Sequence, residues 1–199
     1  MLEKVKEYTR GALRPLAKKI TDINPNTLTL FGLLLSLVSG FLFASREVLL
    51  AGIFLLASGF LDALDGEVAR ENNRITGFGG FLDSVCDRFA DAAVLIGAMY
   101  GGLAAIPPFP DWFMGAFAIT GSLMVSYTRA RAEAAGAHAS VGFGERPVRM
   151  IIIVIGAFLG MVNRAILLVV IISFITVVQR IAHVRKILKS RNTGTNDNF

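Results

Sequence analysis

Aspartates recur at helical spacing in two neighbouring apolar stretches of the chain. Asp62 and Asp65 are three residues apart. Asp83, Asp87 and Asp91 follow one another at intervals of four. Residues three or four apart share a face of an α-helix, so each stretch predicts a helix with a stripe of carboxylates. Carboxylates near hydrocarbon are costly unless a cation neutralises them, and hard divalent cations prefer oxygen ligands. The pattern therefore predicts a site for divalent metal ions.

The chemistry that such a site favours is phosphoryl transfer. The short linker 71–78 would place the two helices side by side, and the number of carboxylates suits two metal ions that hold attacking and leaving oxygens. Gly66, Gly79 and Gly80 leave room beside the acids for a bulky ligand, which a bare cation pathway does not need. Two other interpretations are a buried salt-bridge network, in which Arg70 and Arg88 offset the acids, and the cation or proton pathway of an ion-coupled transporter.

The composition places these acids in a membrane protein. Of the 199 residues, 54% are hydrophobic and 18% are charged, whereas a typical globular chain has about 25% charged residues. This excludes a disordered chain and a coiled coil, and a single cysteine, Cys86, excludes a disulfide scaffold. We therefore expect an all-α integral membrane fold.

Six apolar runs predict six transmembrane helices in one domain over 1–199. A span needs about 20 residues, and several runs need their flanks to reach that length. The runs are 27–44, 48–63, 81–105, 113–127, 150–162 and 166–178. We expect a six-helix bundle over 27–188 and a flexible polar tail over 192–199. Small residues at four-residue spacing, such as Gly32, Ser36 and Gly40, predict close helix packing within the chain or between copies.

The first 22 residues predict an amphipathic helix. Apolar positions from Leu2 to Ile20 recur every three or four residues, and lysines and arginines occupy the opposite face. Such a helix suits the membrane interface, or else it packs as an ordinary surface helix. Of the 20 lysines and arginines, 17 fall on one side of the predicted spans and two, Arg46 and Arg164, on the other. This bias predicts that both termini and the acidic site are cytoplasmic, and no nucleic-acid partner is expected.

The acids belong to a longer motif, Asp62-x2-Asp65-Gly66-x2-Ala69-Arg70-x8-Gly79-x3-Asp83-x3-Asp87. At all eight positions it resembles the signature of the CDP-alcohol phosphotransferases. These multi-pass membrane enzymes of phospholipid synthesis move a phosphatidyl-type group from a CDP-linked lipid to an alcohol and release CMP. The resemblance implies the same six-helix fold, preceded by an amphipathic helix. It also implies that the protein lies in the cell membrane, in contact with membrane lipids.

The resemblance also assigns roles to residues. It implies that two Mg²⁺ ions, or Mn²⁺, are held by Asp62, Asp65, Asp83 and Asp87. It makes Asp87 the catalytic base that takes the proton of the acceptor hydroxyl. The residues that it implies for binding the CDP-lipid are Asn26, Thr29, Asp65, Gly66, Ala69, Arg70, Thr76 and Gly79.

Arginines on the cytoplasmic side bear on the acceptor alcohol. The stretches 126–133 and 142–149 are rich in arginine, which suits an anionic acceptor because guanidinium groups match phosphate oxygens; the alternative is ordinary charge flanking the spans. The stretches resemble those of family members that use inositol 1-phosphate, which implies Arg129, Arg149 and Arg180 as ligands of its phosphate. Glycerol 3-phosphate is the alternative acceptor, and the donor is CDP-diacylglycerol or CDP-archaeol. Analogy with the family implies a homodimer.

Overall fold

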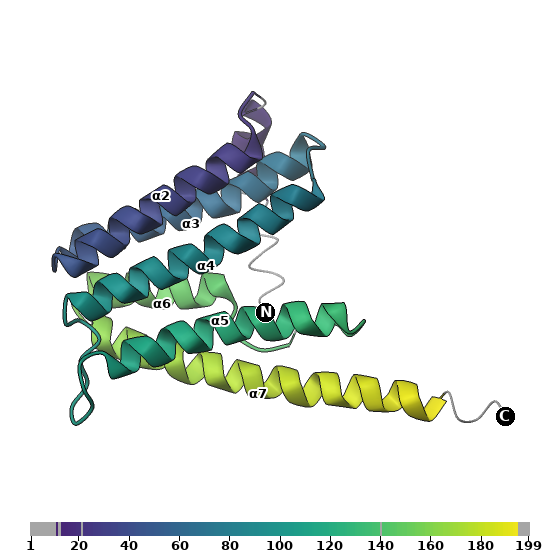
Figure 1. Cartoon of the computed structure of the whole chain (residues 1–199). Helices are drawn as coiled ribbons and strands as arrows, with labels where there is room; N and C mark the ends of the chain where they lie inside the picture. The colour runs from purple at the N-terminus through teal and green to yellow at the C-terminus, as the bar shows by residue number, and fades with distance from the viewer. Residues whose placement is uncertain (1–10, 12, 21, 140, 195–199) are drawn as a thin grey trace. The chain divides into compact units, whose positions relative to one another are not determined.

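The computed structural model describes residues 11, 13–20, 22–139 and 141–194. These residues form helices joined by short turns, and no strand occurs among them. The helices are α2 (Pro25–Ala44), α3 (Val48–Glu71), α4 (Gly77–Tyr100), α5 (Phe113–Ala134), α6 (Arg146–Phe158) and α7 (Val162–Gly194) (Figure 1). The described residues divide into two compact units, one up to Gly97 and one from Ala98 onward. The all-α prediction is confirmed, and the single domain stays a prediction.

In the first unit, α2 and α3 form an antiparallel pair held by small polar side chains. The Ser58 hydroxyl donates to the carbonyl oxygen of Gly32 at 2.8 Å, and its oxygen lies 2.7 Å from the hydroxyl of Ser36. Because Ser58 has already used its only proton, Ser36 is the donor between the two. Hydroxyl pairs beside glycine let two helices approach closely in an apolar setting. The pairing brings the start of α2 beside the end of α3.

α4 completes this unit by packing directly on the backbone of α2. A Cβ added at Gly40 would lie 2.5 Å from the carbonyl oxygen of Ala93, and one at Gly97 would overlap the carbonyl of Gly40. Figure 1 shows α2, α3 and α4 side by side. Only glycine at positions 40 and 97 allows this approach, so the contact fixes α4 along α2.

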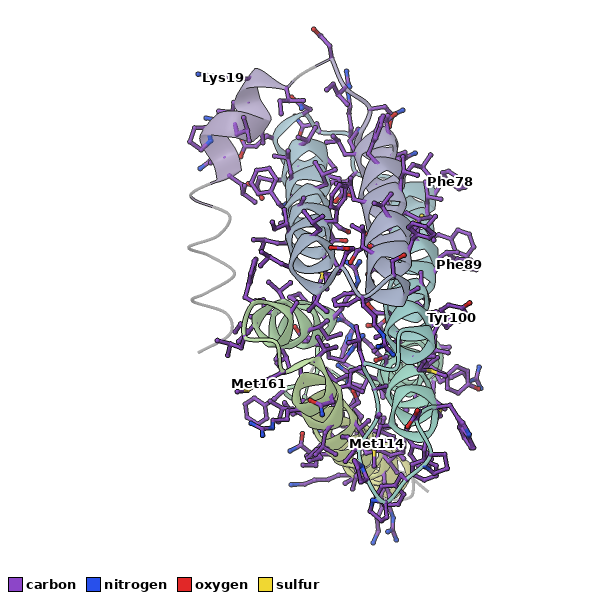
Figure 2. All side chains as sticks on the ribbon, turned by 90° about the vertical axis from the view of Figure 1, so that its left-hand side faces the viewer. Lys19, Phe78, Phe89, Tyr100, Met114 and Met161 are labelled. Atoms are coloured by element: carbon purple, nitrogen blue, oxygen red, sulfur yellow. The ribbon has the colours of Figure 1, made fainter. Side chains whose placement is uncertain are left out.

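The two faces of α4 differ in exposure. Phe78 and Phe89 are each 64% exposed and point away from the ribbon in Figure 2. Ala90 and Val94, on the opposite face, are buried. An apolar outer face of this kind suits a hydrocarbon environment.

The described part of the predicted N-terminal helix, 13–19, is helical and packs on α2 and α3. Leu13 and Ala17 are buried in a cluster with Leu28, Leu64 and Val68. This contact agrees with the interpretation of a helix packed on the rest of the protein. Residues 1–10, 12 and 21 lie outside the described residues, and a membrane-surface location for 1–22 stays a prediction.

The second unit holds α5, α6 and α7. α5 and α6 each pack against α7. α6 ends at Phe158 and α7 begins at Val162, where 150–162 and 166–178 were predicted. The difference arises at Gly160, whose φ of +66° is a left-handed conformation that ends a helix. α7 runs on to Gly194, two residues past the predicted start of the tail at 192; residues 195–199 lie outside the described residues.

Three of the described helices are long and apolar enough to cross a membrane, namely α2, α3 and the part of α7 over Val162–Ser190. α6 has 13 residues, which is fewer than the roughly 20 that span hydrocarbon. In α4, the aspartates lower the mean hydropathy of the helix. The fold is compatible with a multi-pass membrane protein, and the count of six spans stays a prediction.

Candidate active site

Three aspartates from two helices meet in the first unit. Asp62 on α3 and both Asp83 and Asp87 on α4 each offer a carboxylate oxygen, and these oxygens lie within 4.8 Å of one another. All three side chains are partly buried. Carboxylates at this separation repel one another. Their oxygens are suitable ligands for a hard divalent cation, which would offset that repulsion. The structure thus brings together three of the four predicted metal ligands.

The fourth predicted ligand, Asp65, is held by a side chain from α2. Its carboxylate oxygen Oδ2 accepts a hydrogen bond of 2.5 Å from the Thr29 hydroxyl, whose oxygen also lies 3.2 Å from the carbonyl oxygen of Pro25. Asp65 is 6% exposed and Thr29 is 8% exposed. A hydroxyl donor on one carboxylate oxygen orients the other, as the supporting partners of metal ligands commonly do.

A pocket of about 230 Å³ opens beside these acids. The start of α2, the end of α3, the linker after α3 and the start of α4 form its walls. All eight residues predicted to bind a CDP-lipid line it, and the remaining lining residues are Pro25, Arg74, Ile75, Gly80 and Asp83. The structure therefore gathers the predicted nucleotide residues and two acids, Asp65 and Asp83, around one space. The binding roles themselves stay predictions.

Glycines keep this pocket open. A Cβ on Gly79 would lie 3.0 Å from the Thr76 hydroxyl and 3.2 Å from Oδ1 of Asn26, and the Gly79 amide donates to that hydroxyl at 3.0 Å. A Cβ on Gly66 would lie 3.4 Å from a guanidinium nitrogen of Arg70. Polar groups from three elements thus approach the backbone where a side chain would push them away.

Two charged residues at this site were not among the predicted ligands. Arg74 lines the pocket from the linker, and in the sequence it contributed only to the charge bias that predicts membrane orientation. Glu67 is 5% exposed and forms an ion pair with Arg70. The sequence signal for Glu67 was its spacing, since an acid and a base three residues apart pair along a helix. The signal for Arg74 was its place between the two halves of the motif.

The arginines predicted for the acceptor lie in the second unit. Arg149 and Arg180 are 3% and 2% exposed. The Arg180 Nε donates to the carbonyl oxygen of Val141 at 3.0 Å, and the Arg149 Nη1 donates to that of Gly144 at 2.5 Å. Arg129 differs, because it is exposed and pairs with Glu133 at 3.0 Å. Two buried guanidinium groups, from α6 and α7, thus hold the carbonyls of one loop.

A threonine of α7 anchors the same loop. The Gly144 amide donates to the Thr176 hydroxyl oxygen at 2.9 Å, and that hydroxyl donates to the carbonyl oxygen of Ile172 at 2.8 Å. A Cβ on Gly144 would lie 2.8 Å from the hydroxyl oxygen. The loop position, and with it the carbonyls that the arginines bind, depends on Thr176.

The helices, the acid cluster and the glycine-lined pocket place the chain in a known class. It belongs to the CDP-alcohol phosphatidyltransferase family, whose model matches residues 22–182. It is similar to archaetidylinositol phosphate synthase of Pyrococcus horikoshii, with 40% identity over 192 residues, 95% of this chain and 99% of that protein. The enzyme of the same name from Methanothermobacter thermautotrophicus is 37% identical over 195 residues, 95% of this chain and 96% of that protein.

Solved structures agree with this family. The phosphatidylinositol phosphate synthase of Mycobacterium tuberculosis with CDP-DAG bound has a TM-score of 0.76 and 30% identity, over 86% of this chain and 92% of that chain. Its complex with manganese and citrate has a TM-score of 0.77 and 30% identity, over 86% and 88%. The family resemblance seen in the sequence is confirmed: the protein is a membrane transferase of phosphate-containing groups in phospholipid biosynthesis. The manganese in that relative and the carboxylate cluster here both point to a divalent metal.

Proposed function

We propose that the protein transfers the phosphatidyl-type group of a CDP-lipid to inositol 1-phosphate and releases CMP. The observation that carries the proposal is one pocket that is lined by all eight predicted nucleotide residues together with Asp83 of the aspartate cluster. The choice of acceptor is supported by the relatives, which are named archaetidylinositol or phosphatidylinositol phosphate synthases. Two of these names specify an archaetidyl donor, so we test CDP-archaeol beside CDP-diacylglycerol.

The metal in this proposal is Mg²⁺, with Mn²⁺ as a substitute. The donor set of this structure fits it, because three carboxylates from two helices share one small space and Asp65 lines the same pocket as Asp83. We assign two ions to Asp62, Asp65, Asp83 and Asp87. When bound, the ions would neutralise the diphosphate charge and improve CMP as a leaving group.

The protein's own groups then perform the transfer. The Asp87 carboxylate takes the proton of the acceptor hydroxyl. The freed electron pair of that oxygen forms a bond to the phosphorus that carries the lipid. The bond from this phosphorus to the bridging oxygen breaks, and CMP leaves with the bonding pair. Arg70 binds the nucleotide from the pocket wall, and Arg149 and Arg180 bind the phosphate of the acceptor, which is the role that matches guanidinium chemistry.

The cellular setting follows from charge and family. We place both termini and the active site on the cytoplasmic side, because 17 of the 20 lysines and arginines flank the spans on that side. We also propose six spans and a homodimer, the latter by analogy with the family and from the small-residue faces that permit close helix contact.

CMP release tests the reaction. Purified protein in detergent is given Mg²⁺, one of the two donors (CDP-archaeol or CDP-diacylglycerol) and one of three acceptors. The acceptors are inositol 1-phosphate, glycerol 3-phosphate and inositol. We expect CMP, and a lipid product with the mass expected for transfer to inositol 1-phosphate, only when inositol 1-phosphate is the acceptor. Asp87→Asn should lose turnover and keep its melting temperature, whereas Asp111→Asn, an exposed aspartate in the turn before α5, should behave as the wild type. Ion transport without CMP release would favour the transporter interpretation instead.

The acceptor assignment has its own test. Arg180→Lys keeps the charge but removes the planar group that holds the Val141 carbonyl, so the KM for inositol 1-phosphate should rise while that for the CDP-lipid stays the same. Arg164→Lys, on an exposed arginine of α7, is the control. An equal loss for both substrates would overturn the assignment, and a preference for glycerol 3-phosphate would replace the acceptor.

A further inference from the structure

Glu67 is a buried carboxylate next to residues that line the pocket. Glu67 lies on α3 between Gly66 and Val68, is 5% exposed, and is not among the residues that line the pocket. Its oxygen Oε2 accepts two hydrogen bonds from Arg70, one from Nε at 3.0 Å and one from Nη2 at 2.8 Å. Glutamate is almost never buried to this degree unless it is paired, so the ion pair accounts for its position.

The same pair restricts Arg70. The Arg70 side chain is 42% exposed and lines the pocket, so its guanidinium faces the space that a ligand enters. Two of its five N–H donors point to Glu67, and three remain for acceptor oxygens of a ligand. The guanidinium also lies beside Gly66, where a Cβ would be 3.4 Å from Nη2 and 3.5 Å from Nη1. The ion pair with Glu67 orients the Arg70 guanidinium, and Gly66 leaves space for the guanidinium in this position.

We infer that Glu67 is a positioning residue for the donor substrate: by holding Arg70 it fixes the guanidinium that binds the nucleoside diphosphate of the CDP-lipid. The inference rests on the proposed function, because it takes the pocket as the nucleotide site. Glu67 does not contact the ligand in this account and acts only through Arg70. A long arginine that is already ordered loses less freedom on binding than one that must be ordered by the ligand.

The first measurement is the affinity for CDP, a soluble probe that carries the nucleoside diphosphate without the lipid. Glu67→Gln should weaken CDP binding about two- to tenfold, the range expected when one long side chain is immobilised anew. The KM for the CDP-lipid should rise in parallel, while the kcat and the KM for the acceptor stay near those of the wild type. Glu67→Asp keeps the charge but shortens the reach to Arg70, and it should weaken CDP binding as well.

A double-mutant cycle separates positioning from stability. Arg70→Ala should weaken CDP binding, and adding Glu67→Gln to it should cause no further loss, because the two residues act as one unit. The matched control is Glu71→Gln, one turn further along α3, which breaks a pair with Arg14 at 2.6 Å outside the pocket lining. This control should leave CDP affinity unchanged.

Four results would overturn the inference: independent losses in the double variant, the same loss from Glu71→Gln, wild-type CDP affinity in Glu67→Gln, or no CDP binding by the wild type. A lowered melting temperature with unchanged CDP affinity would make Glu67 a purely structural residue. If the wild type binds CDP but releases no CMP from the CDP-lipid with any acceptor, the proposed function fails and the comparison at Glu67 still holds.

Discussion

The bond between Thr29 and Asp65 allows a quantitative test of the metal site. Thr29→Val replaces a hydroxyl by a methyl group of nearly the same size, so the packing between α2 and α3 is kept and one hydrogen bond is lost. That bond is 2.5 Å long, and its partners are 8% and 6% exposed, so water does not readily replace the hydroxyl. A hydrogen bond to a charged group contributes about 1.5–3 kcal/mol.

This energy corresponds to a factor of about 10 to 100 in an equilibrium constant. If the hydroxyl orients Asp65 as a metal ligand, the loss falls on metal binding, and supporting partners of metal ligands commonly contribute about 10- to 100-fold. We therefore expect the Mg²⁺ concentration for half-maximal CMP release to rise by about that factor, whereas the maximal rate at saturating Mg²⁺ falls much less.

The assay is CMP release measured across a Mg²⁺ titration for the wild type and three variants. Thr29→Ser keeps the hydroxyl and should keep the metal dependence. Thr27→Val, on an exposed threonine two residues earlier in the chain, controls for the substitution itself. A wild-type Mg²⁺ dependence in Thr29→Val would refute the idea that the hydroxyl orients Asp65. A higher KM for the CDP-lipid without a change in Mg²⁺ dependence would assign Thr29 to lipid binding alone.

Further predictions concern the second unit, the helix contact and the metal. Thr176→Val removes the hydroxyl that holds the Gly144 amide, so the KM for inositol 1-phosphate should rise about fivefold, the effect of one neutral hydrogen bond of about 1 kcal/mol. Thr120→Val, at an exposed threonine, should leave this KM unchanged. An equal rise in the KM for the CDP-lipid in Thr176→Val would contradict this role. Gly97→Ala forces a Cβ against the α2 backbone and should lower stability by about 1–3 kcal/mol, seen as a lower melting temperature, whereas Gly77→Ala enters open space and should not. EDTA should abolish CMP release, and Mg²⁺ or Mn²⁺ should restore it; activity that survives chelation would rule out the metal.

The sequence predicted well the features that depend on helical periodicity. Asp83 and Asp87 share a face because they are four residues apart, and the short linker after α3 brings Asp62 to them. The helix ends near Gly160 were less predictable, because the apolar run continues through a position where the backbone turns left-handed. Hydropathy reports the environment of a segment and not its dihedral angles.

Contacts between distant segments were beyond the sequence. Neither the bond from Thr29 to Asp65 nor the burial of Arg149 and Arg180 follows from spacing, because each depends on which face a neighbouring helix presents. The sequence predicted Arg149 and Arg180 as ligands of the acceptor phosphate, with ordinary charge flanking the spans as the alternative, and it gave no sign that they are buried and bonded to loop carbonyls. A single sequence carries no signal for such tertiary pairing.

The glycine contact between α2 and α4 has a mechanical consequence for the pocket. The two helices meet near Asn26 and Gly79 at the pocket and again at Gly40 and Gly97, about 21 Å further along α2 at 1.5 Å per residue. Two helices clamped at both ends behave as a stiff frame, so tilting one against the other would separate glycine backbones that touch. A change in the width of the pocket would therefore fall on the walls outside this frame, which are the end of α3 and the linker with Ile75 and Thr76.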